Sequence, residues 1–333
     1  MLKNYIKDIL RKPYYKVHDT ICRHNIDLLE RNQEINSKYK GERCFLVASG
    51  ESTSLIDLKS LSNEYTFGVG YIMFHPEIEK LKLNFFLASE AGSWMDKKGA
   101  HGSHNWPEAY LISNGIDQGK IFLKEVFEKL HSRETTIFLK HDYIKYYQKL
   151  RLFDLYDNNV FYLKTINNLH TNQFPTIDLT MRFSSVGGSI FTSMLILMYM
   201  GYNEIYLCGA GYTYDPIYEL HFYDNYAFPT DIGEDEAVSK LKNIVNSHNK
   251  KMSTHLQYSG FWEKNNYYRG IYVKECCEKA PDTLNHKIIN EYAKSLGVKI
   301  YNIVPHGFES PVYEKITWEE VINEVLPDKQ KLV

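Results

Sequence analysis

The sequence lacks the features that would direct it into a membrane or onto nucleic acid. No stretch approaches the roughly 18 consecutive apolar residues of a transmembrane helix, and the first residues show no signal-peptide pattern. Lysine and arginine number 39 against 41 aspartate and glutamate, so the net charge of −2 provides no basic face for nucleic acid. We therefore expect a cytoplasmic protein with no nucleic-acid partner.

Cysteine is scarce, and two familiar nucleotide-binding signatures are missing. The five cysteines are odd in number and fit neither a disulfide framework nor zinc-ligand spacing: Cys22, Cys44, Cys208, Cys276 and Cys277. The sequence contains neither the glycine fingerprint of dinucleotide-binding proteins nor a Walker loop. These absences predict reduced thiols and no metal site, and they argue against an NAD-dependent oxidoreductase.

Tyrosine, in contrast, is abundant. The chain has 27 tyrosines, many of them between residues 202 and 273. A hydrophobic core rarely needs so many phenols, whereas a cleft for a sugar or a nucleotide uses both their flat faces and their hydroxyl groups.

Short β-rich runs alternate with helical patterns from residue 43 onward. This alternation predicts an α/β fold with a doubly wound and mainly parallel Rossmann-like sheet. Strands are expected at 44–49, 65–70, 84–89, 135–140, 159–164, 204–209 and 298–303, and helices near 53–62, 119–131, 142–152, 188–201, 234–256, 283–296 and 317–325.

Two segments depart from this alternation. Residues 1–40 read as an N-terminal helical segment, and residues 41–330 as one Rossmann-like domain. Residues 1–16 are basic, which leaves two alternatives: a helix on the inner membrane surface, or packing on the domain or on a second subunit of a homo-oligomer. Residues 212–282 follow a strand end and are rich in Tyr, Asn, His and Asp. We interpret them as a lid over the site. The alternative is an inserted loop region that has no function.

The first candidate site is the turn after the strand at 44–49. Small and hydroxyl-bearing residues occur where a strand gives way to a predicted helix: Ser49, Gly50, Glu51 and Ser52. Free backbone N–H groups at a helix start attract a phosphate. The alternative is that Ser52 or Thr53 serves only as the N-cap.

The second candidate site precedes the apolar helix expected at 188–201. Small residues again occupy the turn: Ser185, Gly187, Gly188 and Ser189. Glycine allows the backbone to approach a ligand closely, so two such turns suggest a split site for a nucleotide phosphate and its sugar. Tight packing of the helix on the sheet is the alternative. Further candidates at predicted strand ends are Gly70, Ser89, Glu90, Gly209 and Gly211.

These stretches carry a resemblance that runs from about residue 41 to residue 322. The matching segments are ASGESTSLIDLKSL, FGVGYIMFHPEI, VGGSIFTSMLILMYMG, MGYNEIYLCGAGYTYDPIYELHFY and VKIYNIVPHG. With these motifs the chain resembles a bacterial family of glycosyltransferases related to the MptE-like pterin pyrophosphokinases. More distantly, it resembles the sialyltransferases of Campylobacter-type lipooligosaccharide clusters.

The sequence departs from the family pattern at several positions. The Gly-Asn of the first turn is Ala48-Ser49 here, and the Pro is Glu51. The Asn that ends the second strand is Gly70, and the Asp after the strand at 204–209 is Gly211. In the sialyltransferases both Asn side chains contact the CMP donor. Ser49 keeps a polar group there, and Gly70 does not.

The resemblance implies a metal-independent, inverting transfer of a CMP-activated sugar, a nonulosonate such as sialic acid, to a glycan or glycolipid of the bacterial surface (lipopolysaccharide or capsule). Tyrosine hydroxyls would stabilise the departing phosphate, and the expected donors are Tyr212, Tyr214 and Tyr223, with Tyr218 and Tyr226 nearby. His221 matches the family's HFY motif and is the expected base. His286 lies inside a predicted helix, and His75, His101, His104 and His141 are weaker candidates.

Two other function classes remain open at this point. One is a pyrophosphokinase that uses ATP and magnesium, for which few carboxylates stand near the first turn. The other is a non-catalytic nucleotide or carbohydrate binder with a degenerate donor site, which Ala48, Gly70 and Gly211 would fit. The transferase itself needs no cofactor beyond the CMP-sugar as co-substrate.

Overall fold

The computed structural model describes residues 26–50, 53, 56–75, 77–88, 127–128, 130, 134–144, 147, 157–167, 177–185, 188–210, 281–304, 310 and 312–326. Statements about structure below refer to these residues. The predicted lid at 212–282 lies almost entirely outside them, as do residues 1–25.

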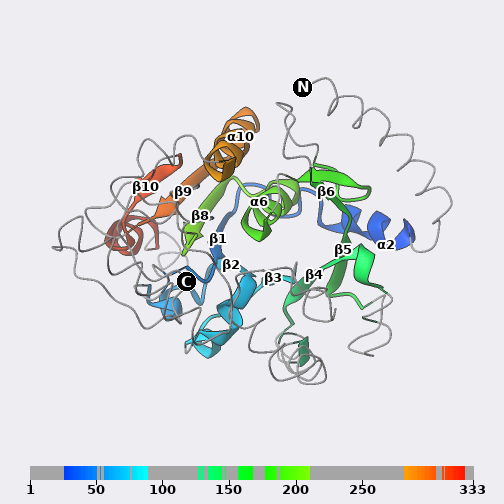
Figure 1. Ribbon diagram of the computed structural model, residues 1–333. Coiled ribbons are helices and arrows are strands. Elements are labelled where there is room, and N and C mark those ends of the chain that lie inside the picture. The colour runs from blue at the N-terminus through cyan, green and yellow to red at the C-terminus, as the bar shows by residue number, and fades with distance from the viewer. Residues whose placement is uncertain are drawn as a thin grey trace, which may run out of the picture.

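An eight-stranded sheet forms the centre of the fold (Figure 1). Its strand order is β10-β9-β8-β1-β2-β3-β4-β5, and every neighbouring pair is parallel. The strands are β1 (Arg43–Val47), β2 (Tyr65–Val69), β3 (Phe85–Ala88), β4 (Thr136–Lys140), β5 (Val160–Leu163), β8 (Glu204–Cys208), β9 (Lys299–Ile303) and β10 (Glu314–Ile316). The predicted doubly wound, parallel Rossmann-like sheet is therefore confirmed.

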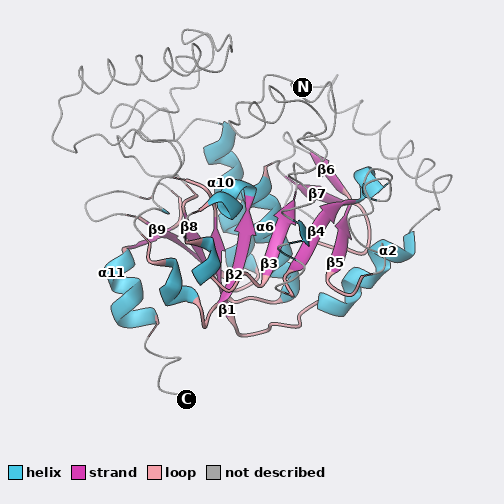
Figure 2. Cartoon of the chain, turned by 90° about the horizontal axis from the view of Figure 1, so that it is seen from below, coloured by secondary structure: helices cyan, strands magenta, loops and turns pink. Residues whose placement is uncertain are grey.

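Both faces of the sheet are covered, which explains why its strands are continuous apolar runs. On one face, Cys44 and Leu46 of β1 pack with α6 (Ser189–Met200) and α10 (Pro281–Ser295). On the other face, Phe45 and Val47 join a second core beneath short helical turns. These turns are η3 (Leu58–Leu61), η4 (Gly70–Phe74), η5 (Ile78–Lys80), α11 (Trp318–Glu320) and the π-helical turn η9 (Val321–Val325). Figure 2 shows α6 and α10 side by side behind the strands.

Helix α6 is apolar on all sides and therefore has to be enclosed. Its residues from Phe191 to Met200 are all buried. Gly201 ends the helix in the left-handed conformation (φ 93°), and its N–H donates to the carbonyl oxygens of Leu197 and Met198. Immediately afterwards the chain enters β8, so the sequence pattern of apolar helix, glycine and strand translates directly into structure.

A second, two-stranded parallel sheet stands apart from the main one. It pairs β6 (Thr165–Asn167) with β7 (Phe183–Ser185), and β7 leads into α6. The N-terminal elements α2 (Ile26–Glu30) and η1 (Arg31–Ile35) pack against β5. The Asn32 amide donates to the carbonyl oxygens of Tyr162 and Leu179, at 2.7 and 2.6 Å, and fixes η1 to the domain.

All seven predicted strands are present, with ends that differ by one or two residues. The helices expected at 188–201 and 283–296 correspond to α6 and α10, and that at 317–325 to α11 and η9. The prediction is wrong near 53–62, where the regular element is the short 3-10 helix η3. Within the described residues, no helix has the length and apolar character to cross a membrane.

Candidate functional site

The carboxyl ends of β1 and β8 define the topological switch point of the sheet. From β1 the chain continues on one side to β2, and later it returns to place β8 on the other side. In open parallel sheets ligands bind at the carboxyl ends of the strands, where the strand order reverses in this way. The residues that leave β1, β2 and β8 are therefore the first place to look for a site.

The turns after β1 and β8 touch through their backbones. The N–H of Ala48 donates to the carbonyl oxygen of Cys208, and that of Gly50 donates to Gly209, both at 2.8 Å. A Cβ on Gly50 would lie 2.2 Å from the Gly209 carbonyl oxygen, and Gly209 has a φ of +68°. Only glycine allows this approach, because any side chain at Gly50 would overlap the opposite backbone.

Thr53 closes the first turn from inside. Its side chain is fully buried, its hydroxyl donates to the carbonyl oxygen of Ala48 at 2.7 Å, and its N–H donates to that of Gly50 at 3.0 Å. The Thr53 hydroxyl is thus used within the turn. Because the described segment that follows forms the four-residue η3 instead of an α-helix, the expected helix dipole at this turn is not supported.

Ser49 and Gly70 lie next to each other at the ends of β1 and β2. Gly70 adopts a φ of +60°, and a Cβ built on it would be 3.5 Å from the Ser49 hydroxyl oxygen. Both residues are partly exposed. The strand pairing thus brings together the two positions at which the resembling family carries asparagine.

The start of α6 lies at the same edge of the sheet. The carbonyl oxygens of Tyr199 and Met200, at the end of α6, accept from the N–H groups of Ser37 and Tyr39, which precede β1. The helix therefore runs antiparallel to β1, and its first residue, Ser189, lies toward the carboxyl ends of the strands. Gly188 is the N-cap with a φ of +79° and no side-chain capping bond.

Seven of the predicted site residues belong to the described part of the chain: Ser49, Gly50, Gly70, Ser185, Gly188, Ser189 and Gly209. The first three and Gly209 come together at the ends of β1, β2 and β8, and Ser185 ends β7 just before α6. The other ten lie outside the described residues and stay predictions: Glu51, Ser52, Ser89, Glu90, Gly187, Gly211, Tyr212, Tyr214, His221 and Tyr223.

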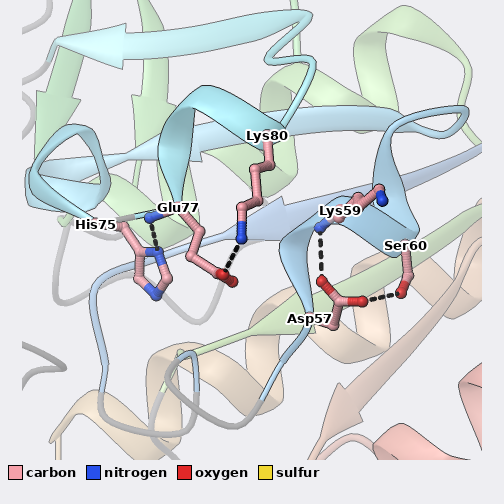
Figure 3. A network of polar contacts seen from close by, with 6 residues as sticks. All are labelled: Asp57, Lys59, Ser60, His75, Glu77 and Lys80. Atoms are coloured by element: carbon pink, nitrogen blue, oxygen red, sulfur yellow. Dashed lines mark hydrogen bonds and ion pairs between the residues drawn. The ribbon is translucent and has the colours of Figure 1, made fainter.

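His75 follows η4 and serves a local structural purpose (Figure 3). Its Nδ1 accepts a 3.1 Å hydrogen bond from the N–H of Glu77, and the side chain is only 7 % exposed. Burial lowers the pKa of His75, and the negative charge of Glu77 opposes this only in part. Glu77 in turn forms an exposed ion pair with Lys80.

Asp57, also drawn in Figure 3, is the N-cap of η3. Its carboxylate accepts from the N–H of Lys59 and the hydroxyl of Ser60, both at 3.1 Å. It also lies near enough to Lys80 to raise the pKa of that ammonium group, after the larger effect of Glu77. These hydrogen bonds and this ion pair shape the connections around β2, and of the residues considered for the site they involve only the weaker candidate His75.

His286 is almost completely enclosed, with 1 % of its surface exposed. Its ring contacts Phe191 in the first turn of α6, with 4.3 Å between centroids, and its Nδ1 lies 2.5 Å from the hydroxyl of Tyr313. Burial lowers the pKa of His286 well below its usual range. An imidazole this enclosed cannot reach an acceptor hydroxyl. It does contact Phe191 of α6, the helix whose first residue lies at the carboxyl ends of the strands.

No family model matches the sequence, and no curated protein matches it. Among solved structures, the chain is similar to the sialyltransferase CstII from Campylobacter jejuni. The complex of that enzyme with the substrate analogue CMP-3FNeuAc has 10 % identity and a TM-score of 0.34. Its complex with cytidine-5'-monophosphate has 11 % identity and a TM-score of 0.36. Each comparison covers 80 % of this chain and 82 % of the other.

Proposed function

We propose that the protein is a glycosyltransferase that moves a sugar from a CMP-activated donor to a glycan or glycolipid of the bacterial surface. The observation that carries the proposal is the convergence at one sheet edge of the Gly50–Gly209 contact, the Ser49–Gly70 pair and the start of α6. Closely approaching glycine backbones and a helix start suit a phosphate, and the switch point is where such a ligand binds.

The proposed reaction is a direct displacement. The oxygen of the acceptor hydroxyl forms a bond to the anomeric carbon, the bond from that carbon to the phosphate oxygen breaks, and CMP leaves with the electron pair. A base takes the proton of the acceptor hydroxyl. The predicted base is His221, and the predicted donors to the departing phosphate are tyrosines of 212–223 together with the first turn of α6. The assignment of His221 and of the tyrosines rests on the sequence resemblance alone.

Nucleotide binding is the first test. The full chain is screened by thermal unfolding with CMP, with CDP and with ATP plus magnesium. CMP at a hundred times its dissociation constant should stabilise the folded state by about 2.7 kcal/mol without added metal. A response to ATP and magnesium alone would instead support a pyrophosphokinase. No response to any nucleotide would overturn the proposal.

Turnover is the second test. CMP release from CMP-sialic acid is followed with and without a glycan acceptor for the wild type, His221→Ala and His255→Ala. The first variant should abolish release while CMP still binds, and His255, another histidine of the predicted lid, provides the matched control. Donor binding by the wild type without any CMP release would favour a non-catalytic nucleotide binder. Full activity of His221→Ala would remove that residue from the mechanism.

A further inference from the structure

Thr53 contacts both of the turns that meet at the carboxyl ends of β1 and β8. Its side chain is fully buried, and its hydroxyl donates to the carbonyl oxygen of Ala48 at 2.7 Å. The same hydroxyl oxygen occupies the space that a Cβ on Gly209 would need, so it also lies against the backbone of the β8 turn. One side chain therefore connects the β1 turn to the β8 turn.

Four main-chain carbonyl oxygens surround this contact, and each accepts a hydrogen bond from the protein. Thr53 supplies two of the donors, its hydroxyl to Ala48 and its N–H to Gly50 at 3.0 Å. The carbonyl oxygen of Cys208 accepts from the N–H of Ala48, and that of Gly209 accepts from the N–H of Gly50, both at 2.8 Å. Each of the four oxygens is thus turned toward a protein donor.

The direction of these carbonyl oxygens affects which ligand the edge can accept. A carbonyl oxygen carries a partial negative charge and repels a phosphate at close range. Because Thr53 is fully buried, the carbonyl oxygens bonded to it are drawn away from the partly exposed side of the turn, at Ser49 and Gly50. Without the Thr53 hydroxyl, the carbonyl oxygen of Ala48 would lose its donor and would have to turn toward another, such as water.

Thr135 makes the same kind of hydrogen bond at the opposite edge of the sheet. It is also fully buried, and its hydroxyl donates to the carbonyl oxygen of Leu83 at 2.8 Å. Leu83 and Thr135 come before β3 and β4, so this bond lies at the amino ends of the strands, away from the switch point. Removal of either threonine hydroxyl should therefore cost similar stability, and only one of the two lies at the proposed site.

We propose that Thr53 is a positioning residue that turns the carbonyl oxygens of the β1 turn away from the phosphate of the nucleotide donor. This inference rests on the proposed function. Thr53 touches no ligand itself and acts through the backbone of Ala48 and Gly50. A positioning role affects the binding of a ligand that carries a phosphate, whereas a purely structural role affects only the stability of the fold.

The experiment compares the affinities of CMP, titrated by calorimetry, and of cytidine, which lacks the phosphate and is measured by its displacement of CMP. Thr53→Val has the shape of threonine without the hydroxyl. It should weaken CMP binding by about tenfold, or about 1.4 kcal/mol, and leave cytidine binding unchanged. Thr53→Ser keeps the hydroxyl and should bind CMP nearly as the wild type does. Thr135→Val is the matched control and should bind CMP as the wild type does.

Thermal unfolding is measured for each variant so that only folded proteins are compared. Thr53→Ala removes the hydroxyl without placing a methyl group against the Ala48 oxygen, and it replaces Thr53→Val should that variant fail to fold. Unchanged CMP affinity in the variant without the hydroxyl would overturn the positioning role, and so would equal losses for CMP and cytidine. A tenfold loss in Thr53→Ser or in Thr135→Val would overturn it as well. A wild type that binds no CMP would instead overturn the proposed function itself.

Discussion

The N–H of Gly50 donates to the carbonyl oxygen of Gly209 at 2.8 Å, although the two residues leave strands that are far apart in the chain. The bond extends the β1–β8 pairing beyond the last strand residues and brings two backbones into contact with no side chain between them. Main-chain geometry sets this contact, so it should respond sharply to any added carbon atom.

Replacement of Gly209 by alanine should therefore be severe. The new Cβ would lie 1.8 Å from the Thr53 hydroxyl oxygen and 2.9 Å from the Ala48 carbonyl oxygen. Backbone strain at positive φ and overpacking together should cost about 3 kcal/mol or more of unfolding free energy. Gly297→Ala is the control, since Gly297 has a similar φ of +72° and nothing within 4 Å, and should cost only about 1 kcal/mol. Urea denaturation gives the unfolding free energy of each variant. Equal losses of stability in Gly209→Ala and Gly297→Ala would contradict the crowding proposed at Gly209.

Gly70 offers a test in the opposite direction, a gain of binding. Asparagine tolerates the left-handed backbone of Gly70, and its Cβ would make an ordinary 3.5 Å contact with Ser49. Under the proposed function Gly70→Asn should bind CMP more tightly, by about fivefold, because a side-chain amide is added beside the donor. Gly70→Asp has the same shape and places a negative charge near the phosphate, so its affinity should not rise. Calorimetric titration measures the CMP affinity of both variants. A higher affinity in both would rule out recognition through the side-chain amide.

The ion pair between Arg43 and Glu64 should contribute stability without affecting the site. The Arg43 guanidinium donates two hydrogen bonds of 3.0 Å to the carboxylate of Glu64, which is 4 % exposed, at the amino ends of β1 and β2. Glu64→Gln removes the larger of the two negative charges that act on Arg43, leaves the weaker effect of Glu204, and should lower the unfolding free energy by about 3 kcal/mol. CMP affinity should remain that of the wild type. Glu77→Gln removes one partner of the exposed Lys80 pair and serves as the control, with no measurable loss expected.

Stability should fall in mild acid because of buried histidines. Burial lowers the pKa of His286, and also that of His75, below the ordinary value of 6.5. Below pH 6.5 the unfolded chain binds protons that the folded chain does not, so this stability is complete above pH 6.5 and is lost as the pH falls through the folded-state pKa values. Tyr313 and Phe191, which contact the His286 ring, carry no charge at these pH values.

The measurement is urea denaturation of the wild type and His286→Gln between about pH 7.5 and pH 5. Removal of one such histidine should reduce the slope of unfolding free energy against pH by up to about 1.4 kcal/mol per unit. His75 should retain its own contribution in this variant. Identical slopes for the two proteins would show that folding does not lower the pKa of His286.

The central strands were predictable because burial on both faces leaves little choice of residue. Runs such as Phe45-Leu46-Val47 and Phe85-Phe86-Leu87 are apolar throughout, as a covered parallel sheet requires. The strand β10 was missed because its residues Glu314 and Lys315 are exposed at the sheet edge and give no such pattern. The three-residue strands β6 and β7 are too short to produce a period.

The candidate site was predictable only in part, for a different reason. Small residues in a turn indicate a close approach of the backbone to a neighbouring group. They do not indicate whether that group is a ligand or another part of the protein. At Gly50 the structure shows that the close neighbour is the Gly209 backbone, and at Gly188 it is the Phe191 ring. The hydroxyl of Thr53 could have faced a ligand or the turn itself, and only the tertiary contact with Ala48 decides between them. The buried contact between His286 and Tyr313 joins two segments that no local sequence pattern connects.

The position of β1 in the middle of the sheet has a consequence for how the chain assembles. One edge of β1 pairs with β2, which follows within a few turns, but the other pairs with β8, where Arg43 lies beside Glu204. During synthesis β1 to β5 can associate while the second edge of β1 stays open until most of the chain has emerged. Such an edge is a template for pairing with other chains, and its late, long-range closure is slow. The nascent protein should therefore aggregate most readily when truncated before residue 204, and the contact between Gly50 and Gly209 should be among the last to form.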